Sequence, residues 1–210
     1  MNLYLVRHGQ TAASRENRFS GSSDPPLTAV GNEMAQAFAR VYALLKWDAI
    51  YTSPMLRARQ TADPLGRLTG VEIRVEDGLK EIDYGEWEGL RQDEVKQRWP
   101  EAFSHWADDV ASRGTPGGET AFHVAARAMR AVEEIRTRHH TGNVLLVSHK
   151  ATLRVITCAL LGLDVRLFRE RIAQPVCAVT MFAVTETTAM LTLLGDRAHL
   201  SESLKHQEGT

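Results

Sequence analysis

The chain has 210 residues, of which 43% are hydrophobic and 24% charged, and its formal net charge is −1. This balance is typical of a soluble globular protein with a substantial core, and it argues against disorder and against general nucleic-acid binding. No stretch approaches the roughly 18 apolar residues of a membrane span, and the N-terminus has no secretory pattern. The two cysteines, Cys158 and Cys177, have no Cys-x-x-Cys spacing, so we expect a cytoplasmic protein without a disulfide framework.

Strand and helix patterns alternate from the beginning of the chain. Residues 2–6 form a short β-prone run, and the Gly-, Ser- and Pro-containing residues 9–27 predict a long surface loop. Thr28 can cap a helix that runs to about Lys46, with apolar residues on one face. Residues 48–52 then predict a second strand.

A second helix should follow this strand. Ser53 as the capping residue and Pro54 in the first turn are a strong start signal. Pro64 should break or kink the helix before it ends near Gly70. Residues 71–75 alternate as a third strand.

Residues 77–120 differ from the rest of the chain in composition and pattern, because they hold three of the four tryptophans, several glycines and prolines, and only short helical patterns. We interpret them as a cap inserted into a single domain that spans residues 1–210. The remaining elements are expected to be a helix over 119–139, a strand over 143–147, a helix over 151–161, and two strands over 176–184 and 190–194, before a polar tail that begins at 201. This order predicts a three-layer α/β/α sandwich with a mostly parallel central sheet and a small inserted cap.

Chemically competent side chains follow the predicted strands. Arg7 and His8 come directly after the first strand, Arg57 after the second, Glu81 after the third and His149 after the fourth. Because the carboxyl ends of parallel strands meet at one edge of a sheet, we expect these five side chains to lie together.

This set of side chains suits phosphoryl transfer. Arg7 and Arg57 can hold the phosphate oxygens by paired hydrogen bonds, and a neutral His8 can attack phosphorus to give a phosphohistidine. His149, expected to be cationic, can stabilise the developing charge, and Glu81 can protonate the leaving oxygen and then activate water. Neighbouring cations should keep the pKa of His8 low. The other histidines lack metal-ligand spacing, so we expect neither a metal nor another cofactor.

Several segments together resemble the histidine phosphatase superfamily, in its phosphoglycerate mutase-like branch. They are Leu-Val-Arg-His-Gly at 5–9, Asn-Arg-Phe at 17–19 with Gly21, Asp-x-Pro-Leu-Thr-x-x-Gly at 24–31, Thr-Ser-Pro-x-x-Arg-Ala at 52–58, Glu-Ile-Asp-Tyr-Gly at 81–85, Gly-Gly-Glu at 117–119 and Val-Ser-His at 147–149. The resemblance implies that His8 is the phosphorylated nucleophile and Glu81 the proton donor. It also implies that Arg7, Arg57 and His149 form the phosphate pocket.

The chain departs from the family pattern at three positions near these motifs. Ser14 and Ser20 stand where the family often has Asn and Gln, and with Gly21 they are candidate substrate-binding residues. Lys150 stands where many members have Gly. It either adds a cation beside the substrate, for instance for a carboxylate, or points into solvent at a helix start.

Three functions remain open from the sequence. A phosphatase would pass the phosphoryl group from His8 to water, a cofactor-dependent phosphoglycerate mutase would return it to substrate, and a non-catalytic ligand-binding module would keep only the fold. His149 lies 68 positions after Glu81, which leaves room for only a small cap and favours hydrolysis. We expect a small phosphorylated metabolite as the partner (phosphoserine, a phosphoglycerate derivative or a sugar phosphate), with a lean to an amino acid or sugar acid partly because of Lys150. We expect no nucleic-acid or membrane partner, and a homodimer remains an option.

Overall fold

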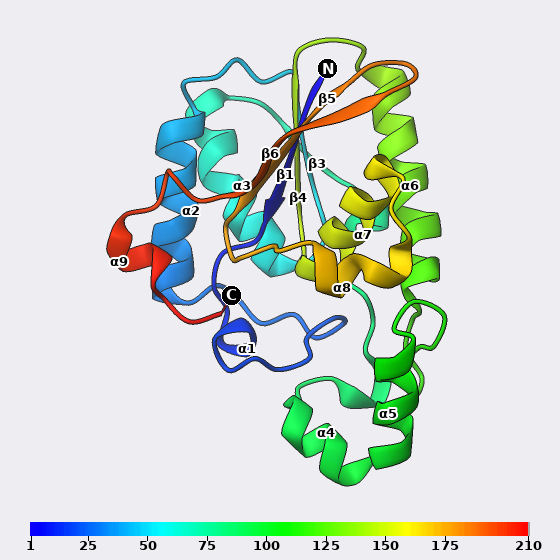
Figure 1. Ribbon diagram of the computed structural model, residues 1–210. Helices are drawn as coiled ribbons and strands as arrows, with labels where there is room; N and C mark the ends of the chain where they lie inside the picture. Colours follow the sequence, from blue (N-terminus) through cyan, green and yellow to red (C-terminus); the bar gives the residue numbers. More distant parts are fainter. Residues whose placement is uncertain (210) are drawn as a thin grey trace.

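The computed structural model, which describes residues 1–209, is built on a six-stranded sheet in the order β3-β2-β4-β1-β5-β6 (Figure 1). The strands are β1 (Asn2–Arg7), β2 (Ala49–Thr52), β3 (Ile73–Val75), β4 (Asn143–Ser148), β5 (Val179–Val184) and β6 (Ala189–Asp196). The first four pair in parallel, whereas β5 runs antiparallel to β1 and β6 antiparallel to β5. The predicted mostly parallel sheet is confirmed.

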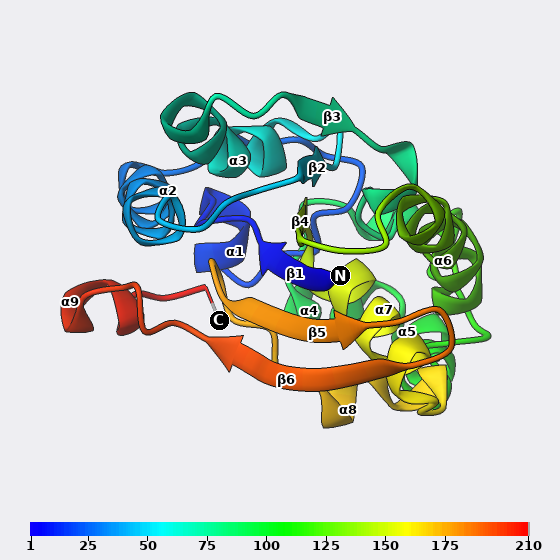
Figure 2. The same ribbon diagram turned by 90° about the horizontal axis from the view of Figure 1, so that it is seen from above.

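Helices cover both faces of the sheet, as Figure 2 shows. On one face lie α2 (Ala29–Tyr42) and α3 (Leu56–Thr69), and on the other α6 (Ala121–Arg138) and α7 (Lys150–Leu161). The side chains of β1 alternate between two cores: Tyr4 and Val6 pack on the α2 and α3 side, Leu3 and Leu5 on the opposite side. Both sets are buried, so β1 is apolar throughout, as a central strand of a three-layer sandwich must be.

The shorter helices gather mostly at the carboxyl ends of the parallel strands. They are α1 (Ala12–Arg15), α4 (Gln92–Arg98), α5 (Pro100–Asp108), α8 (Phe168–Arg171), α9 (Glu202–Lys205) and the 3-10 helices η1 (Asp77–Leu79), η2 (Gly85–Trp87) and η3 (Val165–Leu167). Helices α4 and α5 project beyond the body (Figure 1). Trp87 and Trp106 lie in an apolar cluster that also contains Val124 of α6 and Val155 of α7, which ties residues 77–120 to the body. That these residues are a cap within one domain stays a prediction.

The predicted start of the helix after β2 is wrong by two to three residues. Helix α3 begins at Leu56, and the amide of Leu56 donates to both carboxylate oxygens of Asp24, at 2.9 and 2.8 Å. Ser53 therefore does not cap the helix, and its hydroxyl instead bonds to His149. Pro64 does not break α3, which continues to Thr69 because its buried face, including Ala62 and Leu65, packs on the sheet.

Two other segments contain more regular structure than the sequence pattern predicted. The loop after β1 contains α1, whose Thr11 hydroxyl accepts from the Ser14 amide as a helix cap. The polar tail is ordered through residue 209: it forms α9, and the Glu208 carbonyl accepts from the Gln10 side chain at 2.8 Å. None of the helices formed by residues 1–209 is both long and apolar enough to cross a membrane.

Candidate active site

His8 lies immediately after β1 and is buried. Its Nδ1 is 2.7 Å from the Gly9 carbonyl oxygen, which can only accept, so Nδ1 carries the proton and Nε2 keeps a free lone pair. Burial, with the nearby charges of Arg57 and Arg7, holds the pKa of His8 well below its usual range. The side chain is therefore a neutral imidazole, as expected from the sequence.

His149 lies at the end of β4 and precedes the first residue of α7, with its ring centroid 5.2 Å from that of His8. Its Nδ1 accepts a hydrogen bond from Arg57 Nε at 3.2 Å, and its Nε2 lies 2.8 Å from the Ser53 hydroxyl. Burial and the charge of Arg57 lower its pKa well below the usual range. The expectation of a cationic His149 is wrong, because an arginine donates to one of its nitrogens. Its Nε2 therefore carries the proton and donates to the Ser53 hydroxyl.

The two arginines differ in how they are held. Arg7 is buried at the end of β1, and its Nη1 donates to the Gln174 carbonyl at 2.9 Å, while its Nε has no partner among residues 1–209. Burial lowers its pKa to about 10, which leaves it charged at neutral pH. Arg57 instead donates to the carbonyls of Ser20, Gly21 and Ser23, so it fixes the loop before α2 beside the site.

Glu81 is held at the N-terminus of α7. Its Oε1 accepts from the amides of Ile82 and Thr152, at 3.0 and 3.1 Å, while the Thr152 hydroxyl donates to the Lys80 carbonyl at 2.6 Å. Its Oε2 accepts only from the Ala151 amide, at 3.1 Å. Because Oε1 already has two amide donors, Oε2 is the oxygen with room for a proton.

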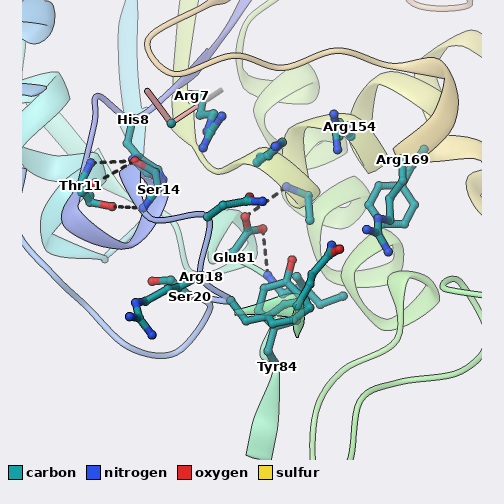
Figure 3. Close-up of a pocket in the computed structure, with 18 of the residues that line it drawn as sticks. Arg7, His8, Thr11, Ser14, Arg18, Ser20, Glu81, Tyr84, Arg154 and Arg169 are labelled. Atoms are coloured by element: carbon teal, nitrogen blue, oxygen red, sulfur yellow. Dashed lines mark hydrogen bonds between the residues drawn. The ribbon is translucent and has the colours of Figure 1, made fainter. Parts of the chain in front are cut away.

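These side chains surround one pocket of about 140 Å³ (Figure 3). Of the residues proposed from the sequence, it is lined by Arg7, His8, Ser14, Ser20, Arg57, Glu81 and Lys150. His149 lies behind His8 and Arg57, and Gly21 supports Arg57 through its carbonyl without lining the pocket. Both serine hydroxyls make local bonds, Ser14 to the Thr11 carbonyl and Ser20 to Ser23, so their contact with substrate stays a prediction.

Two supporting residues were missed in the sequence. Glu88 accepts hydrogen bonds from the amides of Gly21, Ser22 and Ser23 and thereby fastens the loop that Arg57 also holds. A Cβ on Gly21 would lie 1.8 Å from the Ile82 carbonyl oxygen, so this close approach requires glycine. The sequence has several acidic residues close to Glu81. Only the contacts in the folded chain show that Glu88 supports the loop whereas Glu81 lines the pocket.

Arg127 on α6 is the other missed residue. It donates to the carbonyls of Gly78, Lys80 and Glu81 at 2.7 to 2.9 Å, and it pairs with Glu119 at 2.9 Å. It therefore fixes the backbone that carries Glu81 without lining the pocket itself. The Gly-Gly-Glu motif that ends at Glu119 was the only sequence signal near it.

Replacing Arg127 by methionine is expected to lower kcat for alkyl phosphates about tenfold, because the segment that carries Glu81 loses its anchor. KM should change much less, and Arg127→Lys should restore part of kcat. Steady-state kinetics of both variants test this, with Arg130→Met, an exposed arginine on the same helix, as control. An Arg127→Met enzyme with the parent's kcat would refute the positioning role.

Comparisons with known proteins agree with these motifs. The family model of the histidine phosphatase superfamily (branch 1) matches residues 3–197. Phosphoserine phosphatase 1 of Hydrogenobacter thermophilus is 34% identical over 168 residues, which cover 80% of each chain. Glucosyl-3-phosphoglycerate phosphatase of Mycolicibacterium vanbaalenii is 35% identical over 171 residues, covering 78% of this chain and 75% of that protein. The solved structure of Bacillus stearothermophilus YhfR is 32% identical, with a TM-score of 0.89 over 95% of this chain and 99% of that one.

Proposed function

The chain belongs to the histidine phosphatase superfamily and is a phosphatase of small phosphate esters, and we propose that it works through a phosphohistidine on His8. The observation that carries the proposal is the free Nε2 of a neutral, buried His8 in a pocket that Arg7, Arg57 and Glu81 also line. A nucleophilic nitrogen, fixed cations and one carboxyl group are what this two-step reaction needs.

In the first step, the lone pair of His8 Nε2 attacks phosphorus in line with the ester oxygen. The P–N bond forms as the P–O bond breaks, and the leaving oxygen takes its proton from Glu81 Oε2. Arg7 stabilises the equatorial oxygens through its unpartnered Nε–H, while His149, whose Nε2–H donates to Ser53, accepts from Arg57 Nε and so holds that arginine in place. Arg57 adds a fixed positive charge and keeps the pocket wall in place.

In the second step, water attacks the phosphohistidine and gives its proton to Glu81, now a carboxylate. The P–N bond breaks, inorganic phosphate leaves, and His8 returns to its neutral form. The same residues therefore serve both steps, and no metal is needed to neutralise charge.

Hydrolysis rather than mutase chemistry is the favoured outcome. Both relatives described above are named as phosphatases, one of phosphoserine and one of glucosyl-3-phosphoglycerate. The small segment between Glu81 and His149 supports the same choice, since it offers little to shield a phosphohistidine from water. Phosphoserine, a phosphoglycerate derivative or a sugar phosphate is the proposed substrate, whereas cytoplasmic location and dimerisation stay predictions.

A direct comparison of the two activities tests this proposal. The purified protein, treated with EDTA, should release phosphate from p-nitrophenyl phosphate and from small metabolite esters, and should show no more than trace conversion of 3-phosphoglycerate to 2-phosphoglycerate with bisphosphoglycerate present. Dominant mutase activity would contradict the proposed hydrolysis and favour a phosphoglycerate mutase. Loss of activity on EDTA treatment would contradict the metal-free mechanism.

A further inference from the structure

Three further cations line the pocket beside the phosphate-binding residues. Lys150 and Arg154 are one turn apart on α7, and Arg169 comes from α8. All three line the pocket, and Figure 3 shows Arg154 and Arg169 on the side opposite His8 and Ser14. The mechanism above uses none of them.

These cations are not neutralised within the described chain. Among residues 1–209, none of the three forms an ion pair, and Arg154 Nε is buried without a hydrogen-bond partner. Arg18, which also lines the pocket, contrasts with them, because it pairs with Glu16 and Glu94. Among the described residues, ion pairs are thus present at Arg18 but absent at Lys150, Arg154 and Arg169.

The three cations lie close enough to destabilise one another's charge. Burial, together with the charges of Arg7, Arg154 and Arg169, lowers the pKa of Lys150 to about 7. The guanidinium of Arg169 is fixed over the Trp106 ring, 4.3 Å from its centroid. Holding three half-buried cations together without a partner is unfavourable unless a negative charge binds there.

No described side chain supplies that charge. Glu81 is the one carboxylate among the described residues that line the pocket, and its oxygens already accept from the start of α7. A phosphate group at His8 would be held by Arg7 beside the positive charge of Arg57. The missing negative charge must therefore come from another part of the bound molecule.

We propose that Lys150, Arg154 and Arg169 form a subsite for a second negatively charged group of the substrate, a carboxylate or a second phosphate. This inference rests on the proposed phosphatase function and narrows its substrate class. Lys150 and Arg154 are about 6 Å apart along the helix axis, which suits a group only a few bonds from the ester phosphate. A positively charged amino group beside that anion is disfavoured, since the subsite has three cations and no free carboxylate for it. Phosphorylated sugar acids and hydroxy acids fit, and phosphoserine does not.

Four matched esters test the subsite: glycerol 3-phosphate, 3-phosphoglycerate, glycerol 1,3-bisphosphate and O-phosphoserine. We expect kcat/KM for 3-phosphoglycerate or the bisphosphate to exceed that for glycerol 3-phosphate about tenfold or more, with phosphoserine well below the better of them. Whichever of 3-phosphoglycerate and the bisphosphate has the higher kcat/KM then shows whether the subsite prefers a carboxylate or a second phosphate. Equal values for glycerol 3-phosphate and both doubly anionic esters, or phosphoserine as the best substrate, would overturn the inference.

Substitutions test whether Arg154 and Arg169 cause this substrate preference. Arg154→Gln and Arg169→Gln should each lower kcat/KM for the preferred ester about tenfold and for p-nitrophenyl phosphate less than about threefold, and the lysine variants should recover part of the loss. Arg171→Gln, an exposed arginine at the end of α8, is the matched control and should change neither value. Equal losses on both substrates in folded variants would assign the cations a structural role. No hydrolysis of any ester by the unmodified protein would instead refute the proposed function.

Discussion

Replacing His8 by asparagine is expected to abolish phosphate release from p-nitrophenyl phosphate, with a fall in kcat on the order of 10⁴-fold or more. The asparagine amide can still donate to the Gly9 carbonyl that now holds Nδ1, so the fold should persist. The lost atom is Nε2 with its lone pair, and the neighbouring His149 cannot replace it, because its Nε2 carries a proton and donates to Ser53. Circular dichroism and thermal melting should confirm that the variant is folded.

The covalent intermediate gives this prediction a second readout. After rapid alkaline quenching, the parent enzyme should carry a phosphoryl label on the peptide that contains His8, and the variant should carry none. The exposed His140→Asn variant is the control and should retain both activity and label. Turnover by the His8→Asn enzyme, or a label on another peptide, would reject His8 as the nucleophile.

Replacing Glu81 by glutamine is expected to slow hydrolysis of alkyl phosphates by about 10²- to 10⁴-fold, and of p-nitrophenyl phosphate far less. An alkoxide needs a proton to leave, whereas nitrophenolate leaves without one. The glutamine keeps the length of the side chain but cannot pass a proton from Oε2 to the substrate. Single-turnover rates of histidine phosphorylation for a series of leaving groups measure the difference directly.

Two controls separate proton transfer from local damage at Glu81. Thr152→Val removes the hydroxyl that donates to the Lys80 carbonyl and lies 3.1 Å from Oε1, while leaving the Glu81 carboxyl group, so its effect should not depend on the leaving group. Glu86→Gln neutralises an exposed carboxylate of the same segment and should have no effect. If Glu81→Gln slows both classes of ester equally, Glu81 holds the start of α7 in place and another group donates the proton.

Much of the fold could be predicted because its signals are local. The alternation of apolar strands with amphipathic helices predicted a mostly parallel sheet between two helical layers, and the structure has that arrangement. Parallel pairing also explains why His8 and His149 meet, because β1 and β4 are adjacent and in register from Asn2 with Asn143 to Arg7 with Ser148. A position just after a strand was enough to place these residues at one edge of the sheet.

The predictions were wrong where a residue far away in the sequence determines a helix start or the charge of a side chain. Helix α3 is capped by Asp24, which is 32 positions away, so the nearby Ser53 is free to bond with His149. His149 is neutral rather than cationic because the Arg57 side chain donates to it, a contact between residues 92 positions apart. A short stretch of sequence around Leu56 does not include Asp24, and one around His149 does not include Arg57.

The sequence by itself determined the layered fold and the placement of Arg7, His8, Arg57, Glu81 and His149 near one edge of the sheet, since these depend on local patterns and on strands that end at a common edge. Only the tertiary structure decided which tautomer His8 adopts, which oxygen of Glu81 has room for a proton, and that Arg154 and Arg169 share one pocket. Protonation and ion pairing depend on burial and on which charges meet across the fold, and the folded chain alone brings those groups together.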